Sequence, residues 1–463
     1  MIQKTYGKKI LCFLLILLTL TACGSKKQGP PEDTPWNHGL RAIMETEKGY
    51  YSNTNYTQCL RYYEKDTDVT ILLCNKPECS HQKTDFCEAT YKNMRVVNTV
   101  LYDGFLYVLG IEGAENDEGV FQQQQDTGET SIVNIALWRG ALDGSSFDLV
   151  GTVASEENIK KETVNMGGSV QNQDQSFIIH KGFAYIPYYV QFGRGQMGLR
   201  CGGLCRMDLK TGQTQQLYNV ESKMFTVPYN LTGVGDYVYF RGSSGSRAQS
   251  VMRYVISKDE VETVWEYGSQ NVDPTYELYS EDRIYLFTMY PEDENKERAC
   301  GFRVLDAKTL KELPQEEIIT QVSFKKKITE HNFEKVGPFL KMLLYDEKLY
   351  LASEEGLQIY DLKGNLLTSL EGPKEYLEGN LNLGFILDYA INNERLYAMV
   401  HNNAAEYDGS VYNVLYCPLE EVLQGKETWQ KAFDVQGLRT IVELQELLNK
   451  GSVIIRESES SEE

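Results

Sequence analysis

Residues 74–87 hold the densest group of chemically reactive side chains in the sequence: Cys74, Cys79, His81 and Cys87 follow one another as C-x4-C-x-H-x5-C. Three thiolates and an imidazole match the ligand set of a structural zinc site, which takes four protein ligands in a tetrahedron. The spacing is looser than the paired C-x2-C of zinc ribbons, and an exported chain also meets oxidising conditions. We therefore expect a structural zinc here, with a disulfide-linked loop or free thiols as the alternatives.

The remaining cysteines suggest less chemistry. Cys201 and Cys205 could form a local disulfide, although it would close a small and strained loop. Cys59 and Cys417 lie inside strand-like patterns, so we expect them to be small core residues.

Known catalytic motifs are missing from the sequence. Residues 193–198 match G-x-G-x-x-G, but a strand pattern follows instead of the helix that would hold a pyrophosphate. The sequence contains no G-x-S-x-G, P-loop or H-E-x-x-H motif. No catalytic residue is therefore predicted from motifs.

The N-terminal segment predicts where the protein is located. Lys8 and Lys9 precede an apolar run over residues 10–20, which is too short to span a bilayer, and Leu20-Thr21-Ala22-Cys23 follows. This pattern is typical of a lipoprotein signal peptide over residues 1–22, with Cys23 as the lipid attachment site. We expect the mature protein on the outer face of the cell membrane, anchored by its lipid.

Composition limits the partners. The formal net charge is −20, and loss of residues 1–22 removes three lysines and no acid, which makes it −23. A surface this acidic repels phosphate backbones, so we expect no nucleic-acid partner. Apart from the membrane lipid, the expected ligand is a protein or a glycan of unknown identity.

Three further segments follow the signal peptide. Residues 23–35 are rich in Lys, Gly and Pro and predict a flexible tether of about 40 Å when extended. Residues 36–456 form the folded body, and residues 457–463 are a disordered acidic tail.

One strand pattern recurs seven times along the body. A Gly, Asp or Glu turn is followed by an aromatic or aliphatic pair that ends in tyrosine. The copies are Gly49-Tyr50-Tyr51, Gly104-Phe105-Leu106-Tyr107, Gly182-Phe183-Ala184-Tyr185, Asp236-Tyr237-Val238-Tyr239, Asp282-Arg283-Ile284-Tyr285, Glu347-Lys348-Leu349-Tyr350 and Glu394-Arg395-Leu396-Tyr397.

Each copy is the turn of a first hairpin, and a second hairpin follows it. Seven units of four antiparallel strands predict an all-β fold, a seven-bladed β-propeller of four-stranded blades. Only residues 438–449 read as a short C-terminal helix, with a strand pattern over 453–455 after it. The sequence leaves open how the ring is closed.

The two rims of such a ring differ. Both hairpin turns of a unit lie on one rim, so the middle connection and the connection between units lie on the other. The long insertions, residues 111–131, 192–204, 242–249, 292–300 and 402–410, all belong to that second rim. Binding residues concentrate on loops held by a rigid scaffold, so this rim is the expected working face.

The lipobox, the Gly-x-Leu-Tyr units, the Asp-Leu-Lys-Thr-Gly turns and the run from Leu73 to His81 together resemble β-propeller lipoproteins of anaerobic Gram-positive bacteria. The tyrosine-rich units are similar to the blades of the low-density-lipoprotein-receptor-like propeller superfamily. The resemblance covers about residues 36–435 and implies a seven-bladed ring outside a single membrane. Because that family has no agreed activity, it implies no catalytic residue.

Three functions remain on this basis. The leading prediction is a non-enzymatic binding or scaffold module that uses the loop-rich rim. The second is an enzyme acting on cell-wall or other glycans with carboxylates at the propeller channel. The third is a metal-handling or redox protein that uses Cys74, Cys79, His81 and Cys87.

Overall fold

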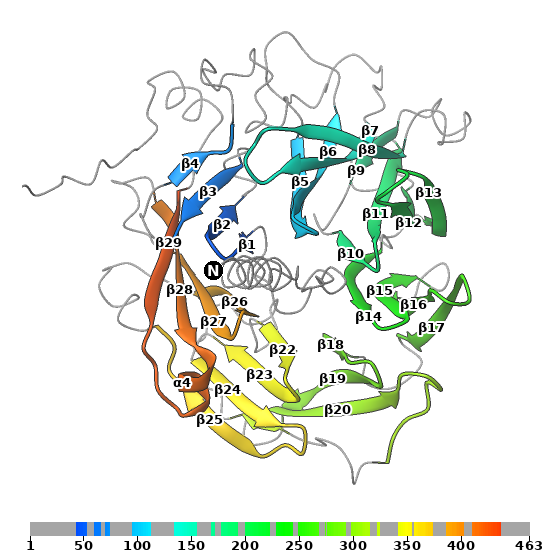
Figure 1. Cartoon of the computed structure of the whole chain (residues 1–463). Helices are drawn as coiled ribbons and strands as arrows, with labels where there is room; N and C mark the ends of the chain where they lie inside the picture. The colour runs from blue at the N-terminus through cyan, green and yellow to red at the C-terminus, as the bar shows by residue number, and fades with distance from the viewer. Residues whose placement is uncertain are drawn as a thin grey trace, which may run out of the picture.

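The computed structural model contains seven antiparallel sheets arranged as blades around a central axis, each with four strands in sequence and one of them with an extra strand, β9 (Figure 1). The predicted seven-bladed β-propeller is therefore confirmed. The structure describes residues 43–52, 60–65, 70–74, 95–112, 134–154, 168–171, 177–192, 200–222, 228–243, 249–267, 274, 276–292, 298–314, 322–324, 341–353, 356–373, 386–401 and 410–436. Within these ranges no helix is long and apolar enough to cross a membrane.

Each blade uses consecutive strands. Blades 1 to 3 comprise β1 (Ile43–Glu45), β2 (Gly49–Ser52), β3 (Arg61–Glu64) and β4 (Thr70–Leu72); β5 (Arg95–Tyr102), β6 (Phe105–Glu112), β7 (Asn134–Ala141) and β8 (Phe147–Ala154); and β9 (Gly168–Gln171), β10 (Ile178–His180), β11 (Phe183–Phe192), β12 (Arg200–Asp208) and β13 (Thr214–Ser222). The extra strand β9 pairs with the far half of β11.

Blades 4 to 7 follow the same order. They comprise β14 (Tyr229–Val234), β15 (Tyr237–Ser243), β16 (Gln249–Val255) and β17 (Glu260–Glu266); β18 (Tyr276–Tyr279), β19 (Arg283–Glu292), β20 (Arg298–Asp306) and β21 (Val322–Phe324); β22 (Lys341–Tyr345), β23 (Lys348–Ser353), β24 (Gly356–Asp361) and β25 (Leu366–Leu370); and β26 (Ile386–Asn392), β27 (Arg395–His401), β28 (Ser410–Pro418) and β29 (Gln430–Gln436). Because β12 begins at Arg200 and β20 at Arg298, two of the expected insertions are shorter than predicted.

The first strand of each blade lies nearest the axis, and the fourth lies at the periphery (Figure 1). The tyrosine that ends each sequence repeat lies on the second strand, and all seven of these tyrosines are buried. They pack between neighbouring blades: Tyr350 of blade 6 and Tyr389 of blade 7, for example, share one apolar cluster. The repeated tyrosine therefore builds the contact between blades, as its place in a strand pattern predicts.

The outer hairpin turns are held by aspartates. Asp361 Oδ1 accepts hydrogen bonds from the backbone N–H groups of Lys363 and Asn365 at 2.9 and 2.8 Å. Asp208 and Asp306 make the same kind of contact in their turns. The side-chain amide of Asn365, which donates to Asp361 Oδ2 at 2.8 Å, lowers the pKa of the Asp361 carboxyl most, and the backbone hydrogen bonds lower it further, because all of them favour the charged form. The repeated Asp-x-Lys sequence is thus a turn signal.

Within the described part of the chain, blades 1 and 7 meet through side chains, because each of these two sheets consists of four consecutive strands. Phe433 on β29 packs between Tyr50 and Tyr63, with ring centroids 4.8 and 4.5 Å apart. Figure 1 shows β29 beside blade 1 at this junction. The predicted strand at residues 453–455 and the predicted helix at residues 438–449 lie outside the described residues.

A buried carboxylate joins the same two blades. Glu45, whose side chain is 4% exposed, lies 2.7 Å from Lys65 Nζ and 3.6 Å from Arg395 Nη1. It also accepts hydrogen bonds from Tyr397 Oη at 2.7 Å and from Asn392 Nδ2 at 3.3 Å. The seam between first and last blade therefore consists of an aromatic cluster and an ionic cluster.

The described structure contains one short helix near the C-terminus, α4 (Leu419–Leu423), between β28 and β29. A C-terminal helix was predicted, but at residues 438–449. Helix α4 stands where blades 2, 3, 4 and 6 have a tight turn between their third and fourth strands, and Leu419 and Val422 bury its inner face. The sequence carries little sign of it, because five residues are too few to display helical periodicity.

Candidate functional site

The pairing between the first and second strands is irregular in several blades, at nearly the same position along the propeller axis. In blades 2 and 7 the register of β5 and β26 shifts just before Asn98 and Asp388. The strand β14 shifts between Tyr229 and Thr232. In blade 3 the inner strand is divided into β10, which pairs with residues 183–185 of β11, and β9, which pairs with residues 189–192. Bulges of this kind are over-represented at rims and beside active sites, where they redirect a side chain.

Five residues with polar groups occupy this height, one from each of five inner strands. Each is paired with the second residue after the repeated tyrosine of its blade. We call this set the channel girdle; its members are Asn98, Tyr229, Tyr276, Lys341 and Asp388. All five are neither buried nor fully exposed. The girdle lies at the end of the inner strands that faces the insertion-rich rim.

The charged pair of the girdle joins blades 6 and 7. Lys341 Nζ lies 2.8 Å from Asp388 Oδ1, and the two side chains are 20% and 14% exposed. Asp388 Oδ1 also accepts a hydrogen bond from the N–H of Tyr389 at 2.9 Å, and Asn98 Oδ1 accepts one from Thr99 at 2.8 Å. These contacts hold Asp388 at its bulge beside an ammonium group. One member of the pair can accept a proton and the other can donate one.

A second ionic cluster lies beside the girdle, between blades 4 and 5. Arg241 donates from Nε and Nη2 to the Glu277 carboxylate at 2.6–2.9 Å, and Tyr267 Oη donates to the same carboxylate at 2.8 Å. The Arg241 guanidinium also lies 5.8 and 5.7 Å from the ring centroids of Tyr229 and Tyr267. The Glu277 side chain is only 3% exposed. We assign this cluster a structural role, since its carboxylate is enclosed and already fully engaged.

Protonation in this second cluster follows from burial and charge. Burial raises the pKa of Tyr267 well above its usual value, and the nearby Glu277 carboxylate raises it further. Burial alone would lower the pKa of Arg241, but Glu277 outweighs it and raises that pKa. Both groups therefore stay protonated at neutral pH. Burial also raises the pKa of the girdle residue Tyr276.

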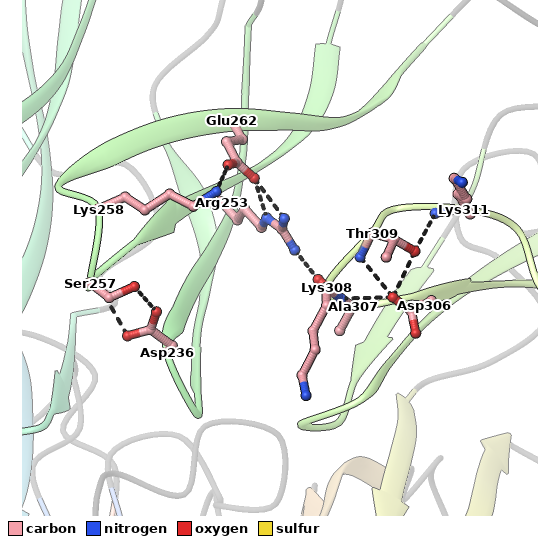
Figure 2. A network of polar contacts seen from close by, with 10 residues as sticks. All are labelled: Asp236, Arg253, Ser257, Lys258, Glu262, Asp306, Ala307, Lys308, Thr309 and Lys311. Carbon is pink, nitrogen blue, oxygen red and sulfur yellow. Dashed lines mark hydrogen bonds and ion pairs between the residues drawn. The ribbon is translucent and has the colours of Figure 1, made fainter.

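The opposite rim holds a different polar network, shown in Figure 2. Arg253 is 2% exposed and reaches from β16 to the Glu262 carboxylate at 2.6 Å and to the backbone carbonyl of Ala307 in blade 5. Lys258 binds the same carboxylate at 2.9 Å. Ser257 donates to Asp236 in the adjacent turn. These contacts join two blades and close their turns, which is a structural role.

The predicted zinc site falls largely outside the described residues. Cys74 is described, is partly buried and has no disulfide to another described cysteine, whereas Cys79, His81 and Cys87 lie outside the described ranges. Within those ranges no group of three or more acidic, histidine or cysteine residues is arranged to hold a metal. The zinc site at Cys74, Cys79, His81 and Cys87 therefore stays a prediction, as do lipidation at Cys23 and the disulfide and thiol alternatives.

The other cysteine predictions have mixed outcomes. Cys417 is fully buried in the core of blade 7, as expected, whereas Cys59 lies outside the described residues. Cys205 is buried and not disulfide-bonded, which contradicts a local link to Cys201. Both residues lie on strand β12, where four residues span about 13 Å, far beyond the Cα separation of a disulfide. Residues 193–198, with the glycine motif, also lie outside the described ranges.

Comparisons with known proteins show the fold. No family model and no curated protein matches the chain. A puromycin hydrolase S511A mutant is similar with 11% identity over 89% of this chain and 57% of its own, at a TM-score of 0.45. An oligogalacturonate lyase from Vibrio parahaemolyticus (9%, 83% and 89%, 0.41) and the β-propeller domain of the Trilobed protease from Pyrococcus furiosus (10%, 68% and 79%, 0.34) are also similar. The chain spans a little over half the length of the hydrolase.

These similar structures correct the leading functional prediction. They are a hydrolase, a lyase and the propeller domain of a protease, and none of them is the non-enzymatic binding module that the leading prediction expected; that prediction is not kept. At such low identity they show only a shared propeller fold, and no residue role is transferred from them. The prediction also rested on the absence of a catalytic constellation in the sequence, which cannot reveal residues that only the fold brings together, such as the ion pair of Lys341 and Asp388.

Proposed function

We propose that this protein is a membrane-tethered extracytoplasmic enzyme that acts on cell-wall or related glycans at the channel girdle. The observation that carries the proposal is the Lys341–Asp388 pair, placed at a strand bulge on the rim of the ring. Lipid attachment at Cys23 and a location outside the cell membrane belong to the same proposal. They are supported by the lipoprotein pattern at the N-terminus.

The girdle offers the groups that such a reaction needs. Asp388 offers a carboxylate that can act as general base and Lys341 an ammonium that can act as general acid, and both side chains are partly exposed. The rings of Tyr229 and Tyr276 offer flat apolar faces, and Asn98 offers an amide, which is a set suited to a sugar ring. Glu277 stays bound to Arg241 and keeps the wall of the girdle in place.

The test is cleavage of glycans by the lipidated protein. Purified cell-wall glycan and fluorescently labelled neutral and acidic oligosaccharides are incubated with the protein, and the products are separated by chromatography. Loss of a general acid or base typically lowers turnover about 100-fold or more, and we expect this for both Asp388→Asn and Lys341→Met.

Matched controls lie on the opposite rim. Lys363→Met and Asp282→Asn remove the same charges from exposed turn residues, so both variants should keep wild-type turnover. If no glycan is cleaved by the wild type, or if the girdle and control variants behave alike, the proposal is wrong. Thermal unfolding of each variant separates a lost active group from a lost fold.

A further inference from the structure

Asn230 differs from the other residues of the inner strands in its exposure. It lies in β14, directly after the girdle residue Tyr229, and it is the one exposed residue on the inner strands wherever their burial is described. Pro228, Leu231 and Thr232 are buried, so the chain is anchored on both sides of it. Because the inner strands lie nearest the axis (Figure 1), the exposed side chain of Asn230 faces the mouth of the channel.

The backbone of Asn230 is unusual as well. Its φ of 53° lies in the left-handed region, which asparagine tolerates better than most residues but still adopts rarely. Every other described non-glycine residue with positive φ lies in a turn between strands, so Asn230 alone has this conformation within a strand. It belongs to a bulge, because Asn230 and Leu231 together stand opposite the single residue Phe240 of β15. Bulges redirect side chains, and backbone outliers of this kind cluster at functional sites.

The side-chain amide of Asn230 is open to a ligand. It makes no hydrogen bond to the part of the chain that the structure describes. The charged groups of the girdle and its wall are instead engaged with one another, Lys341 with Asp388 and Arg241 with Glu277. An amide both donates and accepts hydrogen bonds, as do the hydroxyl and acetamido groups of a sugar, whereas a carboxylate only accepts them. The open group at this point of the channel therefore suits an uncharged ligand.

From these observations we infer that Asn230 is a substrate-binding residue of the girdle and holds a hydroxyl or acetamido group of an uncharged sugar unit. The inference rests on the proposed function for the reaction that follows, but binding itself is measurable without cleavage. An asparagine that only permits the bulge is replaceable by glycine, which adopts positive φ without strain. An asparagine that binds substrate is not.

The variant Asn230→Gly separates these two roles. Binding is measured by fluorescence anisotropy, with labelled neutral oligosaccharide from cell-wall glycan added to full-length protein that carries Asp388→Asn to prevent cleavage. Loss of one hydrogen bond weakens binding about 5- to 10-fold, and we expect this for Asn230→Gly together with an unchanged melting temperature. With Asp388 restored, KM should rise by a similar factor while kcat stays the same.

The matched control is Asn393→Gly. Asn393 is also exposed and has a φ of 45°, but it lies in a hairpin turn on the opposite rim. Its replacement should change neither binding nor stability. The second test variant, Asn230→Asp, keeps the shape of the side chain and removes its donors, so it should weaken binding of the neutral oligosaccharide at least as much as Asn230→Gly.

The possible outcomes separate this inference from the proposed function. Neutral oligosaccharide that binds equally well to wild type, Asn230→Gly and Asn230→Asp overturns the inference, even if cleavage still depends on Asp388. Tighter binding of an acidic oligosaccharide than of its neutral counterpart overturns the substrate class. Oligosaccharide that is bound through Asn230 but never cleaved supports the inference and refutes the proposed function. If no oligosaccharide binds at all, both are wrong.

Discussion

Glu45 offers the sharpest test of how the ring is held closed, because its carboxylate joins two cations across the seam between blades 1 and 7. The substitution Glu45→Gln keeps the size of the side chain and removes its charge. Removing one partner from a fully buried ion pair costs about 3–5 kcal/mol. Lys65 and Arg395 are 22% and 36% exposed, so water can solvate part of their charge.

The expected loss of unfolding free energy is therefore smaller, about 2 kcal/mol. The substituted amide would still accept one hydrogen bond, and Lys65 would still donate to the carbonyl of Thr46, now 2.8 Å away. The loss should be local, because no backbone hydrogen bonds between strands of the two blades are described that would also hold this seam.

Hydrogen exchange followed by mass spectrometry measures both the size and the place of this effect. Peptides from blades 1 and 7 should exchange faster in Glu45→Gln, while those from blade 4 should stay unchanged. Glu312→Gln is the matched control, since it removes a carboxylate that is 42% exposed beside Arg303 within one blade. An exposed pair of this kind contributes about 0.5 kcal/mol. Uniform exchange across all blades, or a variant as stable as wild type, would refute the reasoning.

Three further predictions use other parts of the ring. Burial raises the pKa of the Cys205 thiol to about 12, so a thiol reagent at pH 8 should leave it unmodified in the folded protein, as peptide mass spectrometry would show. Gly212→Ala should lower the melting temperature far more than Gly104→Ala: both glycines have positive φ, but a Cβ at Gly212 would lie 2.0 Å from Val150 O, whereas Gly104 has no atom within 4 Å. Asp361→Asn should destabilise the protein at pH 7, and this difference should shrink as the pH falls below about 3.9, the ordinary pKa of an Asp carboxyl. The lowered carboxyl pKa of Asp361 contributes stability above its unfolded value, which is lost as pH falls through the folded value, and calorimetry over a series of pH values would show it.

The fold was predictable because its signal is repeated. Each copy combines a turn residue with a buried tyrosine two or three positions later, so one ambiguous copy is supported by the other six. The closure of the ring was not predictable, since nothing in the sequence indicates that Phe433 and Tyr50 are in contact. Their contact depends on the angle through which seven blades turn.

The channel girdle was missed for a similar reason. Lys341 and Asp388 are far apart in the sequence, and each is merely a polar residue near the start of a strand. The bulges cannot be recognised directly, because the extra residues Val97 and Leu387 continue an apolar run. One signal was present: Asn98, Tyr276, Lys341 and Asp388 all stand nine residues before the repeated tyrosine. Aligning the seven sequence repeats on that tyrosine would have placed these four residues at the same position along the propeller axis.

None of the strands that the structure describes is shared between blades 1 and 7, and this has an evolutionary consequence. Every blade is one uninterrupted stretch of chain, so duplication or deletion of a single gene segment adds or removes a whole sheet and breaks no strand pairing. In a ring sealed by an exchanged strand, the same event would separate that strand from its sheet. In the present ring, by contrast, only the side chains at the junction between the first and last blades would have to adapt, as Glu45 and Phe433 have.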